Sequence, residues 1–124
     1  MEKEVDVITL CKRLNELTKQ EKCSWRETSE NNRFKLILKN GTIEIYHFIP
    51  EPMVILKPEY YEVSLSDKSG FRYATYKGIS GDNEGFKTFR ALFKEIKELL
   101  ERNRRRKIAV LFDELETPEE TGCQ

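Results

Sequence analysis

The chain of 124 residues is poor in the residue types that most catalytic and metal sites need. It contains one histidine, His47, so a Ser/His or Cys/His catalytic pair and a structural zinc site would both lack their usual side chains. The glycine-containing stretch "GISGDNEG" at 78–85 lacks the Lys-Ser/Thr of a P-loop, and no βαβ pattern precedes it. We therefore expect a protein that is not an enzyme and that has no cofactor, no metal and no small-molecule substrate.

Long apolar runs and a net charge are also missing. The longest apolar run, "IAVLF" at 108–112, has five residues, whereas a membrane span needs about 20. The 22 cations balance the 22 acids, so no overall field draws the chain to polyanions or to an anionic membrane. The start "MEKEVD" has no apolar signal-peptide segment, and Cys11, Cys23 and Cys123 are too widely spaced for a CxxC site. We expect a cytoplasmic protein without membrane contact.

Apolar periodicity predicts a helix at each end of the chain. Near the N-terminus, Val7, Leu10, Leu14 and Leu17 recur every three or four residues, which predicts an amphipathic helix over 3–20. From about residue 83 the same spacing returns, and it extends to at least Arg102. Asp82 or Asn83 is expected to cap this second helix. Its predicted buried residues are Phe86, Phe89, Phe93, Ile96 and Leu100, flanked by Leu92 and Leu99.

The middle of the chain alternates as strands do. Asn40-Gly41 separates two alternating runs and predicts a type I′ hairpin turn, with Leu38 opposite Ile43 and Phe34 opposite His47. Trp25 is expected to reach inward from a preceding strand. A second hairpin is predicted around "SDKSG", and the proline-containing segment 49–59 between the hairpins predicts a loop. The expected core face of the first hairpin comprises Phe34, Leu36, Leu38, Ile43, Ile45 and, as a partly buried structural imidazole, His47.

These elements together predict an α+β fold: an N-terminal helix, an antiparallel sheet of about four to five strands and a long C-terminal helix. Residues 1–116 are expected to form a single domain, and 117–124 a flexible acidic tail. The layout from Trp25 through "LKNGTIEIY" and "YEVSLSDKSG" to the aromatic C-terminal helix resembles small uncharacterised bacterial proteins, often from mobile elements. The resemblance implies no activity and no functional residue. It points to a phage- or plasmid-type accessory or inhibitor protein.

The stretch "RNRRRK" at 102–107 allows two interpretations. Cations at the end of a helix are stabilised by the helix dipole, so the run is explained as a solvated helix end. Alternatively, it contacts a polyanion, although the six acids nearby, from Glu101 to Glu120, reduce the local field. The nucleic-acid candidates are Arg102, Arg104, Arg105, Arg106 and Lys107 of this run, with Arg33 and Lys35 on the first hairpin.

Apolar side chains outside the predicted core favour a protein contact. The stripe after the basic run has helical spacing and predicts a second short helix or a bent continuation, which either folds back on the core or lies against a partner. We expect a non-enzymatic, intracellular protein-interaction module that binds a protein partner or itself, with nucleic-acid binding as the alternative. The interaction candidates are Tyr46 and Phe48 on the outer face of the hairpin, Met53, Val54, Ile55 and Leu56 in the proline segment, and Ile108, Leu111, Phe112 and Leu115.

Overall fold

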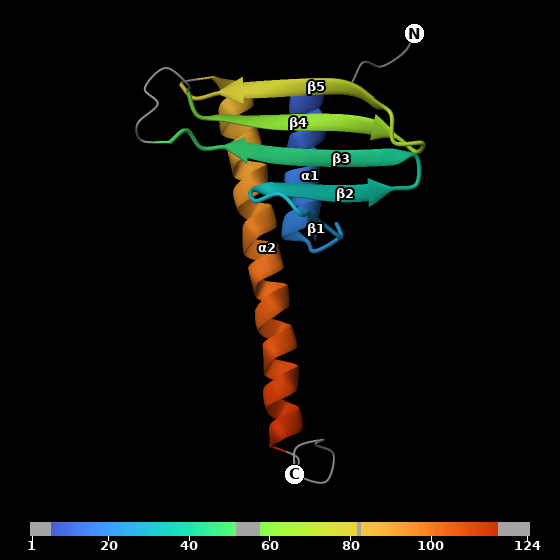
Figure 1. Cartoon of the computed structure of the whole chain (residues 1–124), viewed down its shortest axis with the longest axis vertical. Coiled ribbons are helices and arrows are strands. Elements are labelled where there is room, and N and C mark those ends of the chain that lie inside the picture. Colours follow the sequence, from blue (N-terminus) through green and yellow to red (C-terminus); the bar gives the residue numbers. More distant parts are fainter. Residues whose placement is uncertain (1–5, 52–57, 82, 117–124) are drawn as a thin grey trace.

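The computed structural model describes residues 6–51, 58–81 and 83–116. A sheet forms one layer and two helices lie together behind it as the second layer, which confirms the predicted α+β fold (Figure 1). The elements in chain order are α1 (Val7–Lys19), β1 (Arg26–Glu27), β2 (Arg33–Leu38), β3 (Gly41–Phe48), β4 (Tyr60–Asp67), β5 (Arg72–Ile79) and α2 (Glu84–Leu115).

The sheet is an antiparallel meander in which each strand pairs with the next, in the order β1-β2-β3-β4-β5. Side chains alternate between its two faces, so one face packs on the helices and the other is open to solvent. The helix-facing side chains of the three central strands are buried and form the core with α1 and α2. They are Phe34, Leu36, Ile43, Ile45, Tyr61 and Val63.

The first hairpin has a different register from the predicted one. Leu38 pairs with Gly41 and Phe34 with Ile45, so the loop is Lys39-Asn40 and the predicted pairing was wrong by two residues. Neither Asn40 nor Gly41 has a positive φ angle, so the type I′ turn was wrong too. The glycine is required for another reason, because a Cβ at Gly41 would lie 2.3 Å from the Ser66 carbonyl oxygen of β4. The predicted burial of Phe34, Leu36, Ile43 and Ile45 is nevertheless confirmed, since a shift of two residues keeps each side chain on its face. The predicted burial of Leu38 was wrong, because this residue lies at the end of β2 and is 50% exposed.

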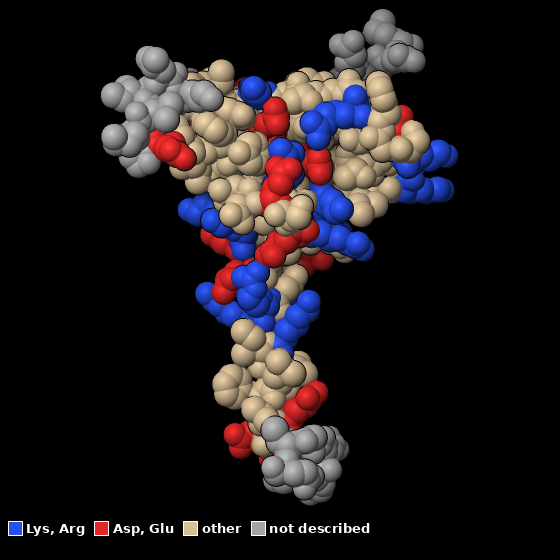
Figure 2. Space-filling model, viewed as in Figure 1, with Lys and Arg blue, Asp and Glu red and all other residues tan. Residues whose placement is uncertain are grey.

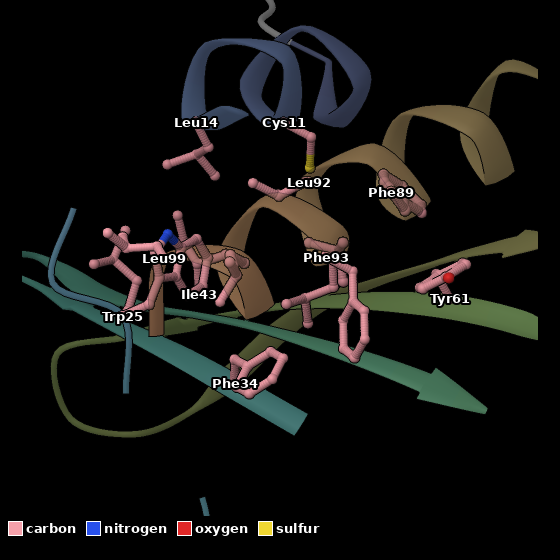
Figure 3. Close-up of a cluster of buried hydrophobic side chains, with 14 of the residues drawn as sticks. Cys11, Leu14, Trp25, Phe34, Ile43, Tyr61, Phe89, Leu92, Phe93 and Leu99 are labelled. Carbon is pink, nitrogen blue, oxygen red and sulfur yellow. The ribbon is translucent and has the colours of Figure 1, made fainter. Parts of the chain in front are cut away.

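Helix α1 begins at an Asp6 cap, whose carboxylate accepts a hydrogen bond from the Thr9 backbone N–H at 2.8 Å. Its buried side chains are Cys11, Leu14 and Thr18, whereas the predicted stripe residue Leu17 is only half-buried. In Figure 3, Cys11 and Leu14 point from α1 toward the neighbouring helix. Burial without a polar neighbour raises the pKa of the Cys11 thiol to about 12.

A polar contact joins α1 to the segment that leads into β1. The Trp25 indole N–H donates to the Thr18 hydroxyl at 2.9 Å, and this hydroxyl donates to the Leu14 carbonyl at 2.7 Å. Both side chains are buried, with Trp25 only 4% exposed. The predicted inward position of Trp25 is confirmed, whereas its hydrogen bond with Thr18 was not predicted.

Helix α2 begins at Asn83, whose side chain accepts from the Phe86 N–H at 2.7 Å, and it continues for 32 residues without a break. At 1.5 Å per residue it is about 48 Å long. The separate short helix predicted after residue 107 was therefore wrong, as was its return to the core. The first half of α2 packs on the sheet and on α1, and the rest projects beyond the sheet (Figure 1). Its buried residues are Phe86, Thr88, Phe89, Leu92, Phe93, Ile96 and Leu99.

Candidate interaction surface

The projecting end of α2 carries an apolar stripe that the described body leaves uncovered. Ile108, Leu111, Phe112 and Leu115 lie between 46% and 62% exposed. Their spacing of three, four and seven residues places all four within an arc of about 100° at 3.6 residues per turn. Figure 2 shows uncharged surface, drawn in tan, on this part of the helix between a blue group of cations and red acids near its end. We call these four residues the apolar stripe.

The apolar stripe is not a continuation of the face that α2 packs on the sheet. At about 100° per residue, the mean direction of the buried residues from Phe86 to Leu99 differs from that of the stripe by roughly 100°. The stripe therefore faces a separate direction. Val110 is also exposed, at 57%, but it lies on the opposite side of the helix from the stripe.

The basic collar, Arg102 and Arg104 to Lys107, lies where α2 leaves the body, and two of its members bind acids of the body. The Arg106 guanidinium contacts both Glu21 carboxylate oxygens at 2.6 and 3.2 Å. Arg104 contacts Glu27 of β1 at 2.6 Å and Glu101 at 2.7 Å. The hydrogen bond from Arg106 lowers the pKa of Glu21. These contacts orient the helix relative to α1 and β1 at the point where it becomes exposed.

Two other exposed members of the basic collar make no ion pair with the described acids of α1 or β1. Arg105 is 74% exposed in its side chain and has Glu101 at 3.6 Å. Lys107 is exposed beside an open depression lined by Trp25, Leu100 and Asn103. These two cations are placed to meet a group from outside the chain.

The two sheet candidates for nucleic-acid contact differ in their surroundings. Arg33 is only 15% exposed in its side chain, contacts Glu30 at 2.8 Å and Glu44 at 3.8 Å, and stacks over the Tyr46 ring. Lys35 lines an open depression on the outer face of the sheet beside Glu44. Both lie next to carboxylates that reduce their attraction for a phosphate.

The aromatic candidates on the outer face of the sheet pack on each other. The Phe48 ring stacks on Tyr60 at 4.9 Å, and Tyr46 meets Tyr60 edge-on at 6.4 Å. Tyr46 and Phe48 are accordingly half-buried, so this group offers less free apolar surface than the apolar stripe. The remaining interaction candidates, Met53 to Leu56, lie outside the described residues.

His47 is part of the packing beside the core. Its predicted partner in β2, Phe34, pairs with Ile45 instead, and on the other side of β3 His47 pairs with Tyr61 of β4. Its ring stacks on the Tyr61 ring at 4.1 Å and meets Phe93 edge-on at 5.4 Å, while Nε2 lies 2.5 Å from a Glu59 carboxylate oxygen. Burial, and secondarily the Glu59 charge, raise the pKa of Tyr61. The imidazole is held on three sides, as a structural histidine would be.

Strand β5 leaves several large apolar side chains exposed. Tyr73 and Tyr76 are exposed on the strand, and Ile79 is exposed at its end. Its contact with α2 is made through backbone, because a Cβ at Gly78 would lie 2.7 Å from the backbone of Gly85. The glycine pair was the available signal, since small residues allow a strand and a helix to approach closely.

Within the described ranges, no three His, Cys, Asp or Glu side chains are grouped to hold a metal ion. In the same part of the chain, neither helix has the length and apolar character that crossing a bilayer requires. The sequence matches no protein-family model, and neither a curated protein nor a solved structure matches the chain. The geometry of the projecting helix is therefore the basis for a functional proposal.

Proposed function

We propose that this protein is a non-enzymatic protein-interaction module whose contact element is the projecting end of α2. The observation that carries the proposal is the apolar stripe, four large side chains in one arc of a helix that the basic collar holds away from the core. An amphipathic helix with a free apolar face binds proteins by placing that face against another helix or in a groove. Aromatic and aliphatic side chains such as Phe112 and Leu111 supply the buried area at such contacts.

The charge distribution supports a protein rather than a nucleic acid as the occupant. Arg104 and Arg106 already pair with Glu27 and Glu21, and a phosphate would have to displace those carboxylates. Acids at Asp113, Glu114 and Glu116 lie on the same segment as the stripe. A duplex or single strand following the helix would meet these negative charges within two turns.

Site-specific photo-crosslinking in the producing cells tests the proposal. A photoreactive phenylalanine analogue is placed at position 112 and, in a matched control, at position 110 on the other side of α2. We expect a protein adduct from position 112 and little from position 110, because only the first lies on the apolar stripe. Equal adducts from both positions, or no protein adduct from position 112, would overturn the proposal.

Nucleic-acid binding through the basic collar, with Arg33 and Lys35, is the alternative proposal. It predicts that labelled single-stranded RNA or DNA binds with an affinity that falls steeply with salt, by a slope near −0.9 per phosphate contacted on a duplex and roughly −0.7 on a single strand. Replacing Arg102, Arg104, Arg105, Arg106 and Lys107 by Ser would abolish that binding. An accessory or inhibitor role of phage or plasmid type, and a cytoplasmic location, stay predictions from the sequence.

A further inference from the structure

We infer that the occupant of the apolar stripe is a second copy of this chain, paired antiparallel about a twofold axis between Leu111 and Phe112. This inference rests on the proposed function, because it names the partner of the same surface. It is based on two properties of the segment 105–116, the symmetric spacing of its apolar residues and the opposite charges at its two ends.

The spacing of the apolar stripe is symmetric about its midpoint. Ile108 and Leu115 are equally far from a point between Leu111 and Phe112, so an antiparallel copy centred there places Ile108 beside Leu115 at both ends. Leu111 and Phe112 lie on either side of the stripe's mean direction. In this arrangement each of them therefore lies next to its own counterpart. A twofold contact requires such a self-complementary patch.

The charges beside the stripe match in the same arrangement. At about 100° per residue, Arg105 and Glu116 lie on one flank of the stripe, and Lys107 and Glu114 lie on the other. In the antiparallel pair, Arg105 of one copy and Glu116 of the other share a flank and differ by about 3 Å along the axis, two residues' rise. The same holds for Lys107 and Glu114. Each flank of the antiparallel pair therefore has two contacts between a cation of one copy and an acid of the other.

Two exposed cations of the basic collar are the ones this pairing uses. Arg104 and Arg106 are paired with Glu27 and Glu21 of the body, whereas Arg105 and Lys107 are exposed and pair with no described acid of α1 or β1. A parallel twofold pair would set Arg105 of one copy beside Lys107 of the other and Glu116 beside Glu114, which is unfavourable between like charges. The described part of an antiparallel partner fits along the exposed end of α2. Residue 116 of the partner would lie level with Lys107 of the first copy, about four residues beyond Asn103, where α2 is still half-buried against the body.

Charge reversal within one chain tests the inference. Sedimentation equilibrium on the full chain should show a monomer–dimer equilibrium between about 10 µM and 1 mM, a weak association because the contact is smaller than a standard interface. The variant R105E/K107E, and separately E114K/E116K, should weaken association by about tenfold or more. The chain carrying all four substitutions should dimerise again, since every flank pair is then opposite in sign.

Two further variants separate the stripe from general effects. Combined L111A/F112A should abolish association, while V110A, which truncates an exposed apolar residue on the other side of the same helix, should leave it unchanged. All replaced side chains are exposed, so an unchanged Trp25 fluorescence spectrum verifies the folded body. A chain that stays monomeric at about 1 mM, or a fourfold variant that stays dissociated, would overturn the inference.

The two proposals fail in different ways. If the adduct at position 112 contains another protein and the purified chain is monomeric, the interaction function holds and the second copy is wrong. If the adduct has twice the mass of the chain and the four-residue reversal restores the dimer, both hold. If there is no protein adduct and no dimer, both are wrong.

Discussion

The hydrogen bond between Trp25 and Thr18 allows a quantitative test of how α1 is joined to the sheet. Replacing Thr18 by Val keeps the shape of the side chain but removes the acceptor of the buried indole N–H. Leaving such a donor unpaired costs about 1–3 kcal/mol. The added methyl offsets about 0.8 kcal/mol of this loss. The Leu14 carbonyl retains its helical hydrogen bond, so these two figures give an expected net loss centred on about 1 kcal/mol, within a range of about 0.2–2 kcal/mol.

Equilibrium unfolding in urea at pH 7 measures this loss in the free energy of unfolding. Far-UV circular dichroism and the fluorescence of Trp25, the single tryptophan, monitor the unfolding. Thr88→Val is the matched control, because Thr88 is a buried helical threonine whose hydroxyl makes no hydrogen bond to any described residue. We expect it to change the free energy of unfolding by no more than about 0.5 kcal/mol. Equal values for the two variants, within about 0.5 kcal/mol, would refute the energetic role of the contact.

Three other residues give independent predictions. Gly41→Ala should lower the free energy of unfolding by about 2 kcal/mol or more, because its Cβ would lie 2.3 Å from a β4 carbonyl oxygen; urea unfolding measures it. The Cys11 thiol should resist alkylation by iodoacetamide at pH 8.5 in the native chain and react in urea. Since its folded pKa is raised from 9.0 to about 12, stability should fall as pH rises from about 9 toward 12, by about 1.4 kcal/mol per pH unit. The pKa of Glu21, lowered by Arg106 from 4.5, should return toward that value in R106Q, measured by NMR titration. Because Glu21 is stabilised in its charged form, its contribution is present above pH 4.5 and is lost as the pH falls below it.

Each of these has a control. Gly70→Ala, at a positive φ of 92° with no atom near the new Cβ, should cost only about 1–2 kcal/mol, and a larger cost there than at Gly41 would contradict the contact with β4. Cys11→Ala should lack the alkaline loss, apart from what other groups contribute. An R106Q chain with an unchanged Glu21 titration would show that this ion pair is not formed in solution.

The faces that β2 and β3 bury could be predicted because they follow from periodicity alone. Phe34, Leu36, Ile43 and Ile45 alternate, and alternation assigns a face whatever the pairing partner is. Register could not be predicted in the same way, since two registers that differ by two residues bury the same side chains. Only the turn expected at Gly41 could decide between the two registers. In the structure, that glycine is required instead because strand β4 lies close to it.

The contacts of the candidate site depend on side chains far apart in the sequence. Arg106 and Glu21 are 85 residues apart, and Arg104 and Glu27 are 77 apart. With 22 acids available in the chain, no local rule selects these partners. The apolar stripe itself was evident from its spacing. The spacing of the stripe could not show that the helix continues unbroken from the core. The polar residues 101–107 interrupt the apolar pattern, although their helix propensity is compatible with a continuous helix.

The exposed end of α2 has a local stability that differs from that of the body. Beyond Lys107 its backbone hydrogen bonds depend on helix propensity and on continuity with the preceding turns, and short helices of this kind are marginal in water. Such a segment opens at a much lower free energy than the core strands do, so its amides should exchange with deuterium long before those of β3. A partner on the stripe would slow that exchange by holding the turns closed. The contact element can therefore unwind and rewind while the sheet stays folded, so that binding and helix formation become a single equilibrium.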